Sequence, residues 1–211
     1  MRGLLIFLGW LSACAVLSML VLYAFVVDLW RIPEDDPLLA ASIEPTLRVG
    51  DLVVLLRRSS VTRGILVRCE DPDAPGRFVV ARAMARDGDR IELRNDLVRL
   101  DGRPLKQSRD CAKARVSVYD PRTAADVSLA CSVEDYGDFP FTTLHSLEPS
   151  EPPVVVEVDA SRWFLVSDNR HVHLDSRDYG LIDPRTCQHI VFRLAGASGV
   201  GDAERRLGPI W

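Results

Sequence analysis

The strongest hydrophobic pattern in the chain is an uncharged run near its N-terminus. Residues 3–27, GLLIFLGWLSACAVLSMLVLYAFVV, contain no charged side chain over 25 positions. A helix of about 20 apolar residues can cross a bilayer, whereas the apolar region of a cleavable signal peptide covers roughly 7–15 residues. The run therefore predicts a retained transmembrane anchor over residues 3–30, with a cleavable signal peptide as the alternative.

After residue 31, short β-branched runs alternate with turn signals. Runs such as DLVVLL, GILVRC, RFVVARAM, DRIELRN, RWFLVSD and HIVFRLAG are typical of strands, and Asp101-Gly102 predicts a hairpin turn. Few windows outside the anchor have helical periodicity. The pattern predicts a mainly β protein with an antiparallel β core over residues 38–105 and 161–195.

Residues 106–160 interrupt this pattern. They are more polar and include the segment SLEPSEPP, so we expect an inserted smaller lobe with loops. The glycine-rich end of the chain, residues 196–211, is expected to form a loose tail.

Charge and length narrow the class of protein. The chain has 211 residues, 47% of them apolar, and a net charge of -4, which allows a substantial core and argues against nucleic-acid binding. Arg2 precedes the apolar run, and the acid-rich segment RIPEDDP follows it. By the positive-inside rule, we expect a single-pass protein of the cell membrane, in contact with lipid, with a cytoplasmic N-terminus and an extracytoplasmic β core.

That topology places four of the five cysteines in an oxidising compartment, where pairing is permitted. We predict that Cys111 and Cys131 are joined, because a small polar lobe gains most from a crosslink. Cys69 and Cys187 are a candidate second bridge between core strands, although four cysteines allow three connectivities. Zinc is disfavoured because the chain contains no C-x-x-C pair.

Three stretches resemble, in order, the boxes of the bacterial type I signal peptidases: ASIEPTLRVGDLVVL from residue 41, RFVVARAMARDGDRIEL from residue 77 and FLVSDNRHVHLDSRDYGLI from residue 164. The resemblance implies a signal-peptidase-like fold and a membrane-anchored serine endopeptidase that needs no cofactor. Its substrates would be the extended signal-peptide segments of secreted proteins, cleaved after small residues, with Ser42 as the nucleophile.

The same resemblance places Ala81 where the family has the lysine that serves as general base. A methyl group accepts no proton, and the guanidinium of Arg82 stays protonated at any relevant pH. The chain's two lysines, Lys106 and Lys113, lie far along the sequence from this box. Ala40 also lacks the hydroxyl that could contribute to an oxyanion site.

The last box offers a replacement base. In the family, a serine there bonds the lysine, and His173 occupies its position here. We hypothesise that His173 is the base for Ser42, since an imidazole titrates near neutral pH. The alternative is that His173 only fills the space left by the lysine. The remaining box residues are expected to support the site structurally: Asp168, Asn169, Arg170, Asp175, Ser176 and Arg177.

A metal site in the same stretch is another interpretation. On an extended strand His171, His173 and Asp175 would share one face, and H-x-H-x-D also opens the ligand motif of metallo-β-lactamase-like hydrolases. His171 and Asp175 would then lie about 13 Å apart, too far for one ion, so no metal is expected.

Two functions therefore remain. One is a signal peptidase I-like endopeptidase whose base has moved to His173. The other is a catalytically inactive homologue that acts as an envelope chaperone or scaffold through the same peptide cleft.

Overall fold

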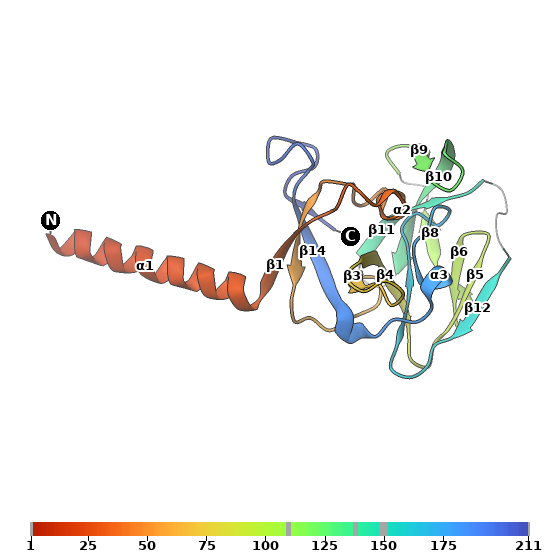
Figure 1. Cartoon of the computed structure of the whole chain (residues 1–211), viewed down its shortest axis with the longest axis horizontal. Coiled ribbons are helices and arrows are strands. Elements are labelled where there is room, and N and C mark those ends of the chain that lie inside the picture. The colour runs from red at the N-terminus through yellow and green to blue at the C-terminus, as the bar shows by residue number, and fades with distance from the viewer. Residues whose placement is uncertain (1, 109–110, 137–138, 148–151, 211) are drawn as a thin grey trace.

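The protein is a β body from which one long helix extends (Figure 1). The computed structural model describes residues 2–108, 111–136, 139–147 and 152–210. The long helix is α1 (Arg2–Phe25), and the short helices α2 (Pro37–Ser42) and α3 (Ser176–Tyr179) lie on the body. The described strands pair antiparallel, which confirms the prediction of a mainly β protein.

The largest sheet carries the segments that resemble the family boxes. Its order is β1-β2-β14-β3-β4-β13, with β15 added to β14. In this sheet the second box forms the long strand β4, and the last box begins on β13. The strands are β1 (Val27–Arg31), β2 (Leu52–Leu56), β3 (Leu66–Glu70), β4 (Phe78–Arg86), β13 (Trp163–Val166), β14 (Cys187–Ala195) and β15 (Gly208–Pro209).

Within the described residues, the other strands form two smaller sheets, ordered β12-β5-β6-β7 and β11-β10-β8, with β9 also paired to β10. They are β5 (Arg90–Arg94), β6 (Leu97–Leu100), β7 (Arg103–Pro104), β8 (Lys106–Ser108), β9 (Arg115–Asp120), β10 (Ala125–Tyr136), β11 (Phe139–His145) and β12 (Val154–Glu157).

The expectation of loops between residues 106 and 160 is therefore wrong for much of this region. Val118 and Leu129 are buried and join a cluster with Leu144, so apolar side chains on β9, β10 and β11 pack together. Apolar residues do alternate with polar ones in this stretch, but they are too few among the polar residues for the pattern to predict strands.

The C-terminal segment is also more ordered than predicted. β15 pairs with β14, and Ile210 is buried in the main core. Arg205 forms an ion pair of 2.6 Å with the buried Asp51. These contacts hold residues 205–210 against the body, so the prediction of a loose tail is wrong for them.

The predicted anchor, residues 3–30, requires two corrections. The helix α1 ends at Phe25, and residues 27–30 belong to strand β1, whose Val27 is paired with Leu56 of β2. Among the residues that the structure describes, no helix combines the length and the apolarity needed to cross a membrane.

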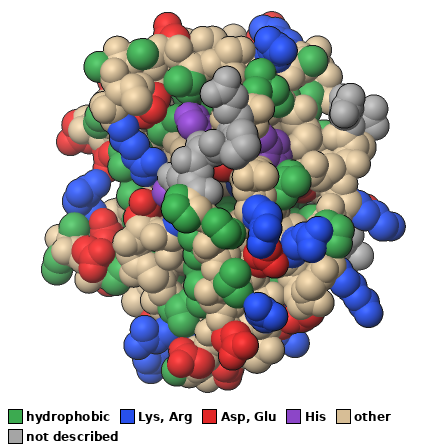
Figure 2. Space-filling view, turned by 90° about the vertical axis from the view of Figure 1, so that its right-hand side faces the viewer, with side chains coloured by type: hydrophobic (Ala, Val, Ile, Leu, Met, Phe, Trp, Pro, Cys, Tyr) green, Lys and Arg blue, Asp and Glu red, His purple; other side chains and the backbone are tan. Residues whose placement is uncertain are grey.

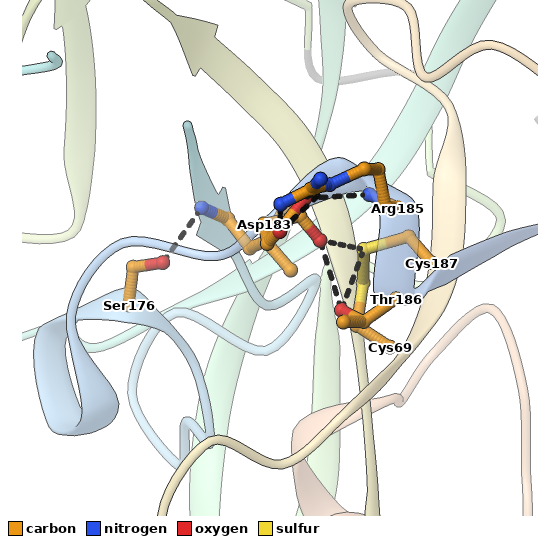
Figure 3. The surroundings of a disulfide bond; sticks show 7 residues. Cys69, Ser176, Asp183, Arg185, Thr186 and Cys187 are labelled. Atoms are coloured by element: carbon orange, nitrogen blue, oxygen red, sulfur yellow. Dashed lines mark hydrogen bonds and ion pairs between the residues drawn. A yellow bond between two sulfur atoms is a disulfide. The ribbon is translucent and has the colours of Figure 1, made fainter. Parts of the chain in front are cut away.

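Both predicted disulfides are present. Cys69 and Cys187 lie directly opposite each other on β3 and β14 and are joined. Figure 3 shows this bridge beside Asp183, whose carboxylate pairs with Arg185 at 2.6 Å. The second bridge joins Cys111, which precedes β9, to Cys131 of β10.

Removal of the Cys111–Cys131 bridge by a double cysteine-to-alanine variant should lower the free energy of unfolding by about 3 kcal/mol, because the bridge closes a loop between residues separated by 20 positions. Denaturant titration of the purified chain measures this loss. Cys14→Ala is the control, since Cys14 is exposed and free. Free thiols at positions 111 and 131 in non-reducing peptide maps would contradict the pairing.

Candidate active site

Ser42 is the last residue of α2, a helix whose start is well defined by its sequence. Asp36 caps the helix by accepting a hydrogen bond from the Leu39 N–H, and Pro37 occupies the first turn, where it costs no hydrogen bond. The carbonyl oxygen of Ser42 accepts a hydrogen bond from the Asn169 N–H at 3.1 Å. The Asn169 side chain donates to the Ala41 carbonyl at 3.0 Å. The first and last boxes therefore meet at Ser42.

The hydroxyl of Ser42 does not point to a base in this structure. It is fully buried and donates to the Leu39 carbonyl at 2.9 Å. Such a bond to the preceding turn is common for serine in helices and keeps the oxygen in a local backbone interaction. A reaction at this oxygen would first require the hydroxyl to rotate away from Leu39.

Ala81 lies on β4 opposite Val67 of β3 and is fully buried. It belongs to the same apolar cluster as Leu39, three residues before Ser42, and Ile43, the next residue after it. Both lysines of the chain lie at exposed positions, Lys106 on β8 and Lys113 in the segment before β9.

Arg82 and Asp168 form a fully buried ion pair next to this position. Two guanidinium nitrogens reach the carboxylate at 2.7 and 3.1 Å, and each side chain is 1% exposed. Thr46 donates a hydrogen bond of 2.5 Å to the same carboxylate, and the guanidinium lies 4.1 Å from the centre of the Phe141 ring. This pair joins β4 to the Asp-Asn-Arg loop, which fixes the loop beneath Ser42.

His173 is buried and bonds a carboxylate that the sequence reading did not single out. Its Nδ1 lies 2.8 Å from the Asp178 carboxylate and 3.9 Å from that of Asp175. Burial alone would lower the pKa of His173, but the bond to Asp178 and the charge of Asp175 outweigh it and raise the pKa above 6.5. The described contacts of His173 and Ser42 do not join the two side chains.

Asp175 organises the end of the last box. It caps α3, accepts a hydrogen bond from the Ser167 N–H at 2.8 Å and binds Arg177 through two nitrogens at 2.8 and 2.9 Å. Burial alone would raise the pKa of Asp175, but Arg177 holds it well below the usual range. The hydroxyl of Ser176 accepts a hydrogen bond from the Leu165 N–H at 2.9 Å. These residues hold β13 and α3 together.

Arg170 is also fully buried, and it pairs with Glu134 of β10 at 2.6 Å. Glu134 and Asp178 were both missed by sequence reasoning. Glu134 lies in the region read as loops. Asp178 was missed because the stretch from residue 171 was read as one extended strand.

The segment is not an extended strand, because the chain bends at residues 171, 172 and 175 between β13 and α3. The turn brings His173, Asp175 and Asp178 together, with ligand-type atoms within 4.8 Å of one another. Arg177 lies 2.8 Å from Asp175, and Arg122 lies 3.6 Å from Asp178. Since these cations already neutralise the carboxylates, we interpret the cluster as an ion-pair network and assign it no metal.

A groove of about 580 Å³ lies beside α2 and the start of β4. Leu39, which accepts the hydrogen bond of Ser42, is one of its walls. The lining residues are Trp30, Pro33, Asp35, Asp36, Pro37, Leu39, Gly76, Arg77 and Phe78.

The fold and the site define a mainly β protein in which a serine at the end of a short helix is held against an ion-paired loop. The family model for signal peptidase, peptidase S26, matches residues 7–191, so the chain belongs to that family. A search of curated proteins found no match.

Proposed function

We propose that this chain is a serine endopeptidase that processes signal peptides, with Ser42 as nucleophile and His173 as general base. Membership of the signal peptidase family implies signal-peptide processing. The observation that carries the choice of base is the 2.8 Å bond between His173 Nδ1 and the Asp178 carboxylate. A carboxylate at Nδ1 orients an imidazole and stabilises its protonated form, so that Nε2 is the atom that takes a proton.

In this mechanism the Ser42 hydroxyl rotates away from Leu39 and attacks the scissile carbonyl carbon. Its proton passes to Nε2 of His173 and then to the leaving amine, which leaves an acyl ester on Ser42. Water hydrolyses that ester with the same base.

We propose the groove beside α2 and β4 as the binding site for the extended peptide. Leu39, Trp30 and Phe78 give it apolar walls, and Asp35 and Arg77 provide polar groups at its edge. Apolar walls with a few polar groups are typical of ligand-binding clefts.

The two disulfides support an extracytoplasmic location for the β body. Disulfides persist in oxidising compartments and are rare in the cytosol. The family is typically membrane-associated, which agrees with substrates that emerge from a membrane.

The pH dependence of cleavage tests the base. The rate should rise with pH and reach half its maximum above pH 6.5, because only the neutral ring accepts a proton and the pKa of His173 is raised. Asp178→Asn removes a carboxylate that raises this pKa, so the midpoint should move to lower pH. Asp183→Asn is the matched control, since Asp183 pairs with Arg185 elsewhere and should leave the midpoint unchanged. An unmoved midpoint in Asp178→Asn would exclude His173 as the base.

A catalytically inactive, peptide-binding homologue is the second candidate. It is favoured by the buried hydroxyl of Ser42, which donates to Leu39. This candidate predicts that the unmodified chain binds a signal-peptide segment, measured by fluorescence anisotropy of a labelled peptide, and leaves it intact.

A further inference from the structure

Outside the family boxes, a serine and a histidine form a direct hydrogen bond. Ser132 lies on β10 and His145 at the end of β11, and Ser132 Oγ is 2.7 Å from His145 Nε2. Thr143 is the register partner of Ser132, and its hydroxyl also lies 2.7 Å from Nε2. The sheet itself therefore sets the geometry of this group.

The hydrogen-bond partners fix the tautomer of His145. Nδ1 lies 3.2 Å from the Asp96 carbonyl oxygen, and a carbonyl can only accept, so Nδ1 carries the proton. In the neutral ring Nε2 is then the acceptor for a hydroxyl. Burial lowers the pKa of His145, with Glu134 and Asp96 acting against this and Arg170 acting with it. The ring is therefore neutral at pH 7 and able to take a proton.

Of the two hydroxyl-bearing residues, only Ser132 lines a groove among the described residues. Thr143 is fully buried, whereas Ser132 is partly exposed and lines a groove of about 740 Å³. Histidine side chains are visible on the molecular face that carries β5, β6 and β12 (Figure 2). His145 lines the same groove.

The buried carboxylate of Glu134 lies where it would stabilise the protonated ring of His145. Glu134 lies 3.6 Å from Nε2 of His145 and is fully buried. Its other oxygen binds Arg170 at 2.6 Å, which holds the carboxylate in place. An imidazolium formed at His145 would thus face an opposite charge within a site of low dielectric, where the attraction is strong.

We propose that Ser132 and His145 form a second nucleophilic site, which takes the acyl group of small activated esters. The Ser132 oxygen forms a bond to the acyl carbon while Nε2 of His145 accepts the hydroxyl proton. The bond from carbon to the leaving alcohol breaks, and that proton passes to the departing oxygen. The products are an acyl ester on Ser132 and the free alcohol.

Reaction with 4-nitrophenyl acetate tests this site in the full chain. Release of 4-nitrophenolate should accompany addition of one acetyl group, located at Ser132 by peptide mapping. Ser132→Ala should abolish this label, and His145→Gln should slow its formation by about 10²-fold or more. The labelling rate should rise with pH and reach half its maximum at a pH below 6.5, the ordinary pKa of histidine, since burial lowers the pKa of His145.

Two controls separate this site from its surroundings. Ser128→Ala alters an exposed serine on the same strand and should label normally. Ser42→Ala should also label normally, which distinguishes this site from the proposed peptidase site. Thermal unfolding verifies that each variant is folded, and His145→Asn replaces His145→Gln if that variant is not. A wild-type chain without a label at Ser132, or equal labelling of Ser132 in a folded His145 variant, would overturn the proposal.

Discussion

His173→Ala is expected to lower the rate of peptide cleavage by roughly 10²–10⁴-fold, the range that a general base contributes. Ser42→Ala alone should also remove nearly the whole rate, because the nucleophile and its base act as one unit and their losses do not add. The substrate is a peptide whose recognition segment ends in Ala-x-Ala, and cleavage is followed by chromatography of the products. His189→Ala is the matched control, since His189 is a partly buried histidine on β14.

Ala81→Lys distinguishes the two proposed functions. A lysine at this buried position would be desolvated, which lowers its pKa and lets it act as a base. If cleavage occurs only in Ala81→Lys, the unmodified chain is inactive and His173 is not its base. If the unmodified chain cleaves and His173→Ala retains full activity, the assignment of the base is also wrong.

The sequence was sufficient where local chemistry decides the structure. The β-branched runs correctly predicted β2, β3 and β4. The family boxes correctly indicated that Asn169 supports the site, since its side chain bonds the Ala41 carbonyl beside Ser42. The polar insert was enough to predict the Cys111–Cys131 disulfide, whereas Cys69–Cys187 was only a candidate bridge between core strands.

The sequence was insufficient where a partner lies far along the chain or a turn changes direction. Glu134 could not be assigned to Arg170 because 36 positions separate them; β11 links them, since it pairs with β10 and its Leu144 carbonyl accepts a hydrogen bond from the Arg170 N–H. Asp178 reaches His173 because Asp175 caps α3, which turns the chain back on itself. Alternation along a strand cannot anticipate such a turn, since it assumes an extended backbone.

Arg82→Met is expected to lower the free energy of unfolding by about 3–5 kcal/mol. The change leaves the Asp168 carboxylate buried without its main counter-charge, and both side chains are 1% exposed. Denaturant titration measures the loss. Arg94→Met is the control because Arg94 is 63% exposed in its pair with Glu92, and such surface pairs contribute about 1 kcal/mol or less.

The double variant Arg82→Met/Asp168→Leu shows whether the stability lost in Arg82→Met comes from the unpaired charge of Asp168. It should recover much of the stability lost in Arg82→Met, since replacing both partners of a buried pair removes the unpaired charge. Additive losses in the double variant, or an Arg82→Met loss no larger than that of Arg94→Met, would contradict this account. Because Asp168 directly precedes Asn169, which bonds Ser42 and Ala41, the recovered double variant should still cleave more slowly than the unmodified chain: its loop has lost the bonds to Arg82 and Thr46 that position it.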